Sequence, residues 1–184
     1  MSIASLKPAI SAADQVIPSN VTAAVRYASG KAVVDFSYLL PKVAAESGFQ
    51  ADAKSSTSSA TGLFQFIEET WFDMIGQHGA KYGLVHYADA LKEGTADPEM
   101  KERILALREN PRLSALMAAE YARANQTVLN RKVGGKIGDT ELYMAHFLRA
   151  GGAARFLNAM AENPDRQAPE MPGPCRARQP LDLL

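Results

Sequence analysis

Helix start and stop signals divide most of this sequence. Pro98 and Pro111 each follow a residue that caps helices well, Asp97 and Asn110, and this order is typical of a helix N-terminus. Apolar residues then recur three or four positions apart, and glycines close the segments. Sustained strand alternation is not found, and the strand-like stretches 32–36 and 63–67 are short. The sequence therefore predicts a mainly α fold with about seven or eight helices.

The expected helices follow from these signals. They cover residues 19–30, 37–47, 67–78, 98–107, 111–133, 139–148 and 153–161. Asp35 or Ser37 caps the second helix, and Asp139 or Thr140 caps the sixth. The glycine pair at 151–152 is expected to break the chain between the last two helices.

Length and composition limit the architecture and the partners. A chain of 184 residues with 47% apolar residues can build one domain with a real core. Lysine plus arginine (20) equals aspartate plus glutamate (20), which argues against nucleic-acid binding through phosphate contacts. The single cysteine, Cys175, excludes an intramolecular disulfide and a Cys-based zinc site. No apolar run approaches the ~18 residues of a membrane span.

Three segments are expected along the chain. Residues 1–18 form an N-terminal extension without the pattern of a signal peptide, and residues 19–163 form a single helical domain. Residues 164–184 hold five of the ten prolines and little apolar pattern. They are interpreted as an extended or disordered tail.

Glu46 is the first candidate for chemistry. Leu39, Val43 and Glu46 share one helix face, and Glu46 lies in the last turn before Gly48. Desolvation and the negative helix end would both raise the pKa of this carboxyl group. A carboxyl group that stays protonated near neutral pH suits a general acid for cleavage of a glycosidic bond. The alternative is a carboxylate that lies in water at the helix end.

A loop rich in serine and threonine, residues 50–61, follows Glu46. It offers hydroxyl groups and backbone amides near that glutamate, and the alternative is a flexible polar loop. A serine nucleophile is not indicated, because the sequence has no Gly-x-Ser-x-Gly elbow.

Two sequence motifs, one following the other along the chain, are the basis of a family resemblance. Residues 45–49 read Ala-Glu-Ser-Gly-Phe, and residues 60–67 read Ala-Thr-Gly-Leu-Phe-Gln-Phe-Ile. Over roughly residues 20–160, the chain resembles the soluble lytic transglycosylase family, which has a goose-type lysozyme-like fold. Phe64 stands where that family usually has methionine. The segments 58–71 and 142–153 are similar to a proteobacterial branch associated with flagella and secretion machines.

The resemblance implies a peptidoglycan lytic transglycosylase. Glu46 would protonate the oxygen that bridges MurNAc and GlcNAc in the β-1,4 bond. As a base, it would then help the MurNAc 6-hydroxyl to close a 1,6-anhydro ring. The acetamido group of the substrate would stabilise the positive charge, so one protein carboxylate suffices, unlike the pair in most glycosidases. The resemblance implies no metal and no organic cofactor.

The resemblance also assigns a set of residues to substrate binding: Ser55, Ser56, Gly62, Leu63, Phe64, Gln65, Tyr143 and His146. Gln65 and the Gly62 backbone would line the sugar subsites. Either Ser55 or Ser56 matches the family serine that polarises the glutamate or holds the acetamido group. The loop length leaves both positions open.

The third family motif, usually Ala-Tyr-Asn-Ala-Gly, is degenerate here. His146 replaces the tyrosine that touches the catalytic glutamate, Phe147 replaces the asparagine, and Arg149 takes the place of the glycine. A charged His146 would lower the pKa of Glu46 and weaken it as an acid. Tyr143, one turn earlier, is an alternative source of a phenol, and His146 is alternatively a core residue. Arg149 either meets carboxylates of the substrate or is solvated.

Two other functions remain open at this stage. One is a hydrolytic muramidase on the same fold, with water as the acceptor, and the other is a non-catalytic protein that binds glycan or assembles with other proteins. A second catalytic carboxylate among Asp52, Glu68 and Glu69 also stays open. The family reading places the protein in the periplasm, with flagellar rod or secretion-system components as further partners.

Overall fold

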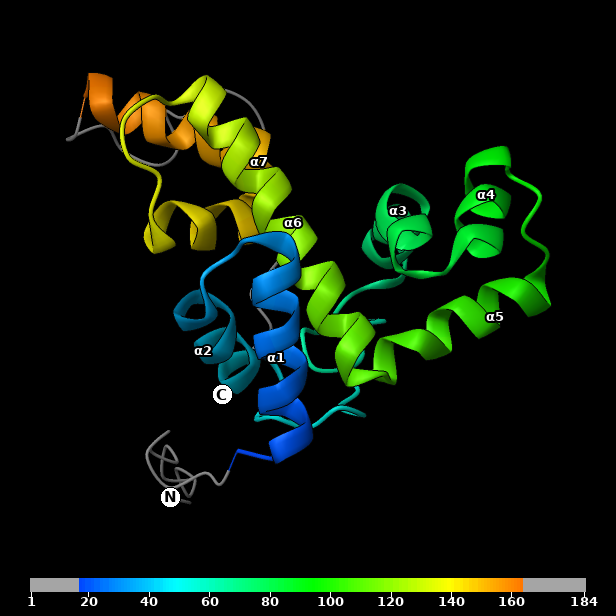
Figure 1. Cartoon of the computed structure of the whole chain (residues 1–184). Coiled ribbons are helices and arrows are strands. Elements are labelled where there is room, and N and C mark those ends of the chain that lie inside the picture. Colours follow the sequence, from blue (N-terminus) through cyan, green and yellow to red (C-terminus); the bar gives the residue numbers. More distant parts are fainter. Residues whose placement is uncertain (1–16, 164–184) are drawn as a thin grey trace, which may run out of the picture.

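The chain folds into α-helices joined by short connections, with one longer loop between residues 48 and 67. The computed structural model describes residues 17–163 and has seven α-helices in that range (Figure 1). They are α1 (Ser19–Ala32), α2 (Phe36–Ser47), α3 (Glu68–His78), α4 (Val85–Glu93), α5 (Pro98–Ala106), α6 (Pro111–Lys132) and α7 (Asp139–Glu162). Two short 3-10 helices, η2 (Gly79–Tyr82) and η3 (Leu107–Glu109), join them. The predicted mainly α fold is confirmed.

Three capping residues are placed as their sequence positions predict. The Asp35 carboxylate accepts a hydrogen bond from Ser37 N (2.8 Å) at the start of α2. The Asp97 carboxylate accepts one from Met100 N (2.7 Å) at the start of α5. Asn110 Oδ1 accepts two at the start of α6. These side chains satisfy backbone N–H groups that have no partner inside the helix, and so they set where each helix begins.

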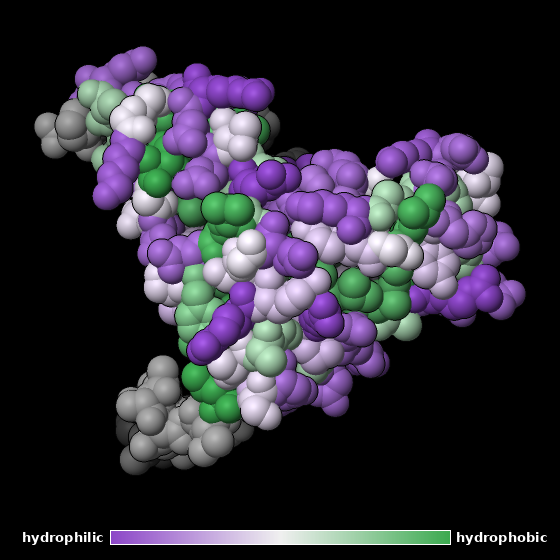
Figure 2. Space-filling model, viewed as in Figure 1, coloured by the Kyte–Doolittle hydropathy of each residue, from purple (hydrophilic) through white to green (hydrophobic). Residues whose placement is uncertain are grey.

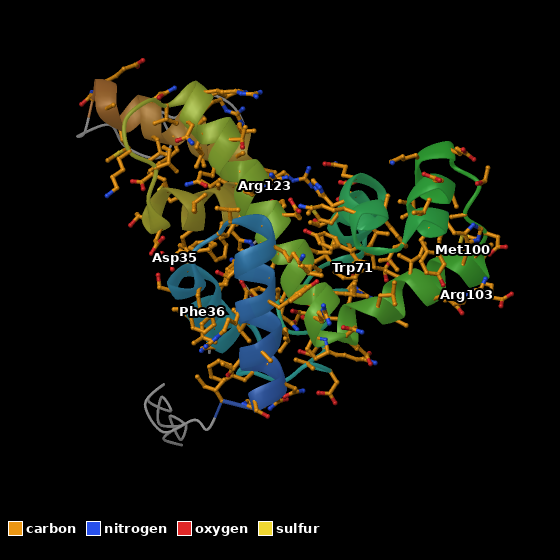
Figure 3. All side chains as sticks on the ribbon, in the orientation of Figure 1. Asp35, Phe36, Trp71, Met100, Arg103 and Arg123 are labelled. Atoms are coloured by element: carbon orange, nitrogen blue, oxygen red, sulfur yellow. The ribbon has the colours of Figure 1, made fainter. Side chains whose placement is uncertain are left out.

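The long helix α6 organises the core. Helix α1 lies along it, α7 packs against its second half, and α3 contacts its side (Figure 1). The core contains the largest fully buried apolar side chains, among them Leu39, Leu63, Phe64, Trp71, Ile75, Ile104, Met117 and Leu129. Trp71 lies between α3 and α5, and its Nε1 donates a hydrogen bond to Ile104 O (2.7 Å) (Figure 3). The indole thereby fills the core and satisfies its one polar group.

One helix has no counterpart among the sequence predictions. Helix α4 buries only Ala88 and Ala90 among its nine residues, and Val85 is exposed. Small alanine side chains give a weak hydrophobic pattern, so periodicity does not reveal this helix.

The last two predicted helices form one element with a kink. Helix α7 is continuous except at Arg149, where φ is 57° and ψ is 157°. The break therefore lies at Arg149 and not at Gly151. The N-terminal cap is Gly138 rather than Asp139 or Thr140, and Glu141 Oε2 accepts a hydrogen bond from Gly138 N (2.8 Å).

Some predictions fall on residues that the structure does not describe. The tail 164–184 with Cys175 and nearly all of the N-terminal extension lie outside residues 17–163. Among the helices of the described part, none has the length and apolar character that crossing a membrane requires. On the face shown in Figure 2, polar residues cover both ends of the molecule, and apolar residues lie in small separate groups.

Candidate active site

The Glu46 carboxylate lies where the end of α2 meets the first half of α7. Its Oε1 is 3.1 Å from His146 Nε2 of α7 and 3.6 Å from Lys42 Nζ, one turn earlier on α2. The Glu46 side chain is only 11% exposed. The structure therefore brings together Glu46 and His146, which are one hundred positions apart in the sequence.

The pKa of Glu46 differs in direction from the sequence expectation. Burial raises it, but the hydrogen bond from His146 and the positive charge of Lys42 outweigh burial, and the pKa lies below its ordinary value. The expectation of a raised pKa from burial and the helix end is therefore wrong for the free protein. It neglected Lys42, whose ammonium group lies on the same helix face.

Lys42 is an unusual neighbour for a candidate acid. Its side chain is 8% exposed, and burial lowers its pKa to about 8, against the opposing effect of Glu46. At neutral pH the ammonium form still predominates. Its Nζ lies over the rings of Tyr143 and Phe147, 5.8 and 6.0 Å from their centroids. Aromatic rings attract a cation through their quadrupole and partly replace water around it.

Aromatic rings surround the pair of Glu46 and His146. The His146 ring meets Tyr121 edge to face (6.1 Å between centroids) and Phe147 in the same manner (5.2 Å). Tyr143 packs on Phe147 (4.7 Å) and remains half exposed. His146, rather than Tyr143, is the residue that reaches the carboxylate. Exposed aromatic rings beside a carboxylate suit the binding of a sugar ring, which has apolar and polar faces.

The loop between α2 and α3 is held by its own backbone and by Arg108. Isolated bridges pair Lys54 with Thr61 and Thr61 with Phe66. The buried Arg108 donates from Nη1 to Ser59 O (2.6 Å) and Phe66 O (3.0 Å). Because these are charge-assisted bonds to carbonyl groups, they clamp the loop strongly. These bonds therefore hold the loop in a defined conformation, and the alternative of a flexible polar loop does not fit them.

Gly62 and Gln65 have roles inside that loop. Gly62 has φ +85°, and a Cβ there would lie 2.1 Å from Arg108 O, so only glycine fits. Gln65 Nε2 donates to Ala53 O (3.1 Å) and Gly62 O (2.9 Å). The amide nitrogen of Gln65 therefore holds the loop in shape, whereas the resemblance implied a contact with sugar.

The remaining predicted binding residues divide into buried and exposed ones. Leu63 and Phe64 are 0% and 2% exposed, so the expectation that they line sugar subsites is corrected to a core role. Ser55 is half-buried, and its Oγ lies 3.4 Å from Thr57 Oγ1. Ser56 is exposed. The choice between the two serines stays open.

The other candidate carboxylates are exposed. Asp52, Glu68 and Glu69 lie at the surface, and Glu69 Oε2 is 3.4 Å from Arg149 Nη2. The three predicted alternatives thus lack the burial that distinguishes Glu46. Within residues 17–163, no group of three or more His, Cys, Asp or Glu side chains is arranged to hold a metal ion.

Sequence reasoning did not identify Lys42 or Tyr121 as part of the candidate site. A signal for Lys42 was present, since it lies four positions before Glu46 and therefore on the same helix face. Nothing in the sequence indicated that the ring of Tyr121 would lie against His146.

No protein-family model matches this sequence. The function is therefore proposed from the motifs together with the geometry around Glu46.

Proposed function

We propose that this protein is a peptidoglycan lytic transglycosylase with Glu46 as its catalytic residue. The observation that carries the proposal is the Glu46 carboxylate itself, 11% exposed at the end of α2 and 3.1 Å from His146 Nε2. A carboxylate that is both nearly buried and held by a second helix is expected in a catalytic site rather than on a solvated helix end. The motif order around Glu46 and Gly62–Gln65 supports the same reaction.

One carboxylate performs both halves of this reaction. The protonated Glu46 donates its proton to the bridging oxygen, and the resulting carboxylate accepts a proton from the MurNAc 6-hydroxyl as the anhydro ring closes. His146 contacts Oε1, which fixes the orientation of the carboxyl group. The acetamido group of the substrate stabilises the positive charge, so a second protein carboxylate is not needed.

The proposal places the protein in the periplasm, where its substrate lies. Local opening of the wall for a flagellum or a secretion machine would be its task, and components of that machine would be its further partners. Both statements come from the resemblance.

Glu46→Gln tests the proposal directly. The amide cannot donate a proton as an acid, so we expect turnover of insoluble peptidoglycan to fall to a few per cent of wild type or less. Mass spectrometry of the released muropeptides measures this, and circular dichroism checks that the variant is folded. Glu102→Gln makes the same chemical change at an exposed position and should retain full activity.

The products discriminate among the open alternatives. Anhydro-muropeptides that vanish in Glu46→Gln support the lytic reaction. Products with reducing ends, which are one water heavier, would instead indicate hydrolysis at the same glutamate. Substantial activity in Glu46→Gln would assign the acid to another carboxylate.

One observation favours a second function, a glycan-binding protein without turnover. The pKa of Glu46 is held below its ordinary value in the free protein, which disfavours the acid form. Wild-type protein that sediments with peptidoglycan but releases no products would establish this second function.

A further inference from the structure

The buried ammonium group of Lys42 has N–H donors that could bind a ligand. Its side chain is 8% exposed, Glu46 is its ion-pair partner, and within residues 17–163 no acceptor lies within hydrogen-bond distance of its Nζ. The nearest carboxylate oxygen, Glu46 Oε1, is 3.6 Å away. A lysine ammonium carries three N–H donors, and leaving such donors buried without acceptors is unfavourable. An oxygen of a ligand that reached the ammonium group would satisfy these donors.

The surroundings of Lys42 favour an anionic oxygen. The rings of Tyr143 and Phe147 lie over the ammonium and keep water away from it. Coulomb attraction is stronger in such a poorly hydrated place. A charge-assisted hydrogen bond to a carboxylate is also roughly twice as strong as a bond to a neutral carbonyl.

We propose that Lys42 binds the lactyl carboxylate of muramic acid and thereby selects glycan strands without stem peptides. This inference rests on the proposed function, which sets the substrate. MurNAc carries a lactyl ether whose carboxyl group is amidated where a stem peptide is attached and free where the peptide has been removed. Only in the peptide-free strand does the lactyl group itself carry a negative charge.

Binding of that carboxylate also changes the state of Glu46. In the free protein, Lys42 and His146 together hold Glu46 in its charged form. A substrate carboxylate at Lys42 offsets the ammonium charge and brings a like charge towards Glu46, which raises the pKa of Glu46. Substrate and proton therefore bind together, and the acid form that the reaction needs arises in the complex.

The first experiment compares one substrate in two forms. Insoluble peptidoglycan is used intact and after complete removal of stem peptides by an amidase, and kcat/KM is measured on both. We expect wild type to prefer the peptide-free form by about tenfold, because one charge-assisted bond is gained. In Lys42→Met the ratio of the two kcat/KM values should fall to about one, because methionine removes the charge. In Lys42→Arg most of the preference should remain, because arginine keeps the charge.

A matched control removes a lysine charge elsewhere. Lys92→Gln changes an exposed residue that lies 4.0 Å from Asp89, and it should keep the wild-type preference. A wild-type ratio near one, or an unchanged ratio in Lys42→Met, would overturn the proposal. If wild type releases no products from either form, the proposed function fails. The preference of Lys42 is then measured as the ratio of protein that sediments with the peptide-free form to protein that sediments with the intact form.

A second measurement needs no variant and so does not depend on folding. MurNAc with its free carboxylate should bind wild-type protein at least several-fold more tightly than its lactyl amide in isothermal titration calorimetry. Titrations in buffers of different ionisation enthalpy should also show proton uptake with the free acid only. Equal affinity for the acid and the amide would overturn the inference.

Discussion

Arg149 has a backbone conformation that residues with side chains rarely adopt. Its φ of 57° and ψ of 157° lie close to a region that is populated almost only by glycine. Its side chain forms an exposed ion pair with Glu69 at 3.4 Å, and exposed pairs stabilise little. The resulting kink separates the part of α7 that carries His146 from the part that follows. Strain at this position is thus located three residues from the proposed site.

Arg149→Gly should stabilise the protein. Relief of the strain is expected to raise the free energy of unfolding by about 1 kcal/mol, at the low end of the cost of such conformations. Arg149→Ala is the matched control, because it also removes the ion pair but keeps a Cβ at positive φ. Urea denaturation followed by circular dichroism measures both. Equal stability of the glycine and alanine variants would show that Arg149 is not strained.

Helix α6 depends on the cap at its N-terminus. Asn110 Oδ1 accepts hydrogen bonds from Arg112 N (3.0 Å) and Leu113 N (3.1 Å), and Pro111 occupies the first helical position. The helix then runs for 22 residues and places Tyr121 against His146 of α7. A local cap of two hydrogen bonds therefore sets the start of the element on which the core and one wall of the site are built.

Asn110→Ala should destabilise the protein by about 1 kcal/mol, the usual cost of losing an N-terminal cap. The control Asn130→Ala makes the same change at an exposed position inside α6, where alanine is the better helix former, and should be neutral or slightly stabilising. Thermal unfolding of the three proteins checks both expectations. If Asn130→Ala lost as much stability as Asn110→Ala, the effect of Asn110 could not be assigned to its role as a cap.

A buried carboxylate joins distant parts of the whole molecule. Glu120 of α6 is fully buried and binds Lys81, Tyr82 Oη (2.5 Å) and Arg123 Nη2 (3.0 Å), with His78 Nδ1 at 3.9 Å. Burial raises its pKa, but the hydrogen bonds from Lys81 and Tyr82 and the charge of Arg123 outweigh burial and hold the pKa below its ordinary value. The network ties η2 and the end of α3 to α6.

Glu120→Gln should cost about 2 kcal/mol of stability near neutral pH, because it weakens the charge-assisted hydrogen bonds from Lys81, Tyr82 and Arg123 while the two cations are half exposed and can be solvated. The folded-state pKa of Glu120 is lowered, so its contribution is fully present above the unfolded pKa of about 4.3 and is lost as pH falls through the folded pKa. The difference from wild type should therefore shrink on acidification. Chemical denaturation at several pH values measures it.

An exposed pair provides the control for Glu120. Glu99 and Arg103 are 3.1 Å apart, with side chains 78% and 53% exposed, and Glu99→Gln should change stability by less than about 0.5 kcal/mol at any pH. A pH-independent loss in Glu120→Gln would mean that packing rather than charge holds the network together.

Much of the fold was predictable because its determinants are local. Caps such as Asp97 and Asn110, prolines at first helical positions and apolar residues at helical spacing act within one or two turns, so a sequence displays them directly. Helix α4 escaped prediction because its buried residues are alanines, and the kink of α7 was expected at Gly151 because glycine is the usual signal.

The candidate site was predictable only in part. The sequence by itself determined the helices other than α4 and the position of Glu46 at a helix end. Only the tertiary structure decided what surrounds the carboxylate: it placed His146 at 3.1 Å and left the ammonium of Lys42 buried beside it. The charge state of Glu46 depends on these neighbours, because electrostatic interactions act through space between groups that the fold, and not the sequence order, brings together.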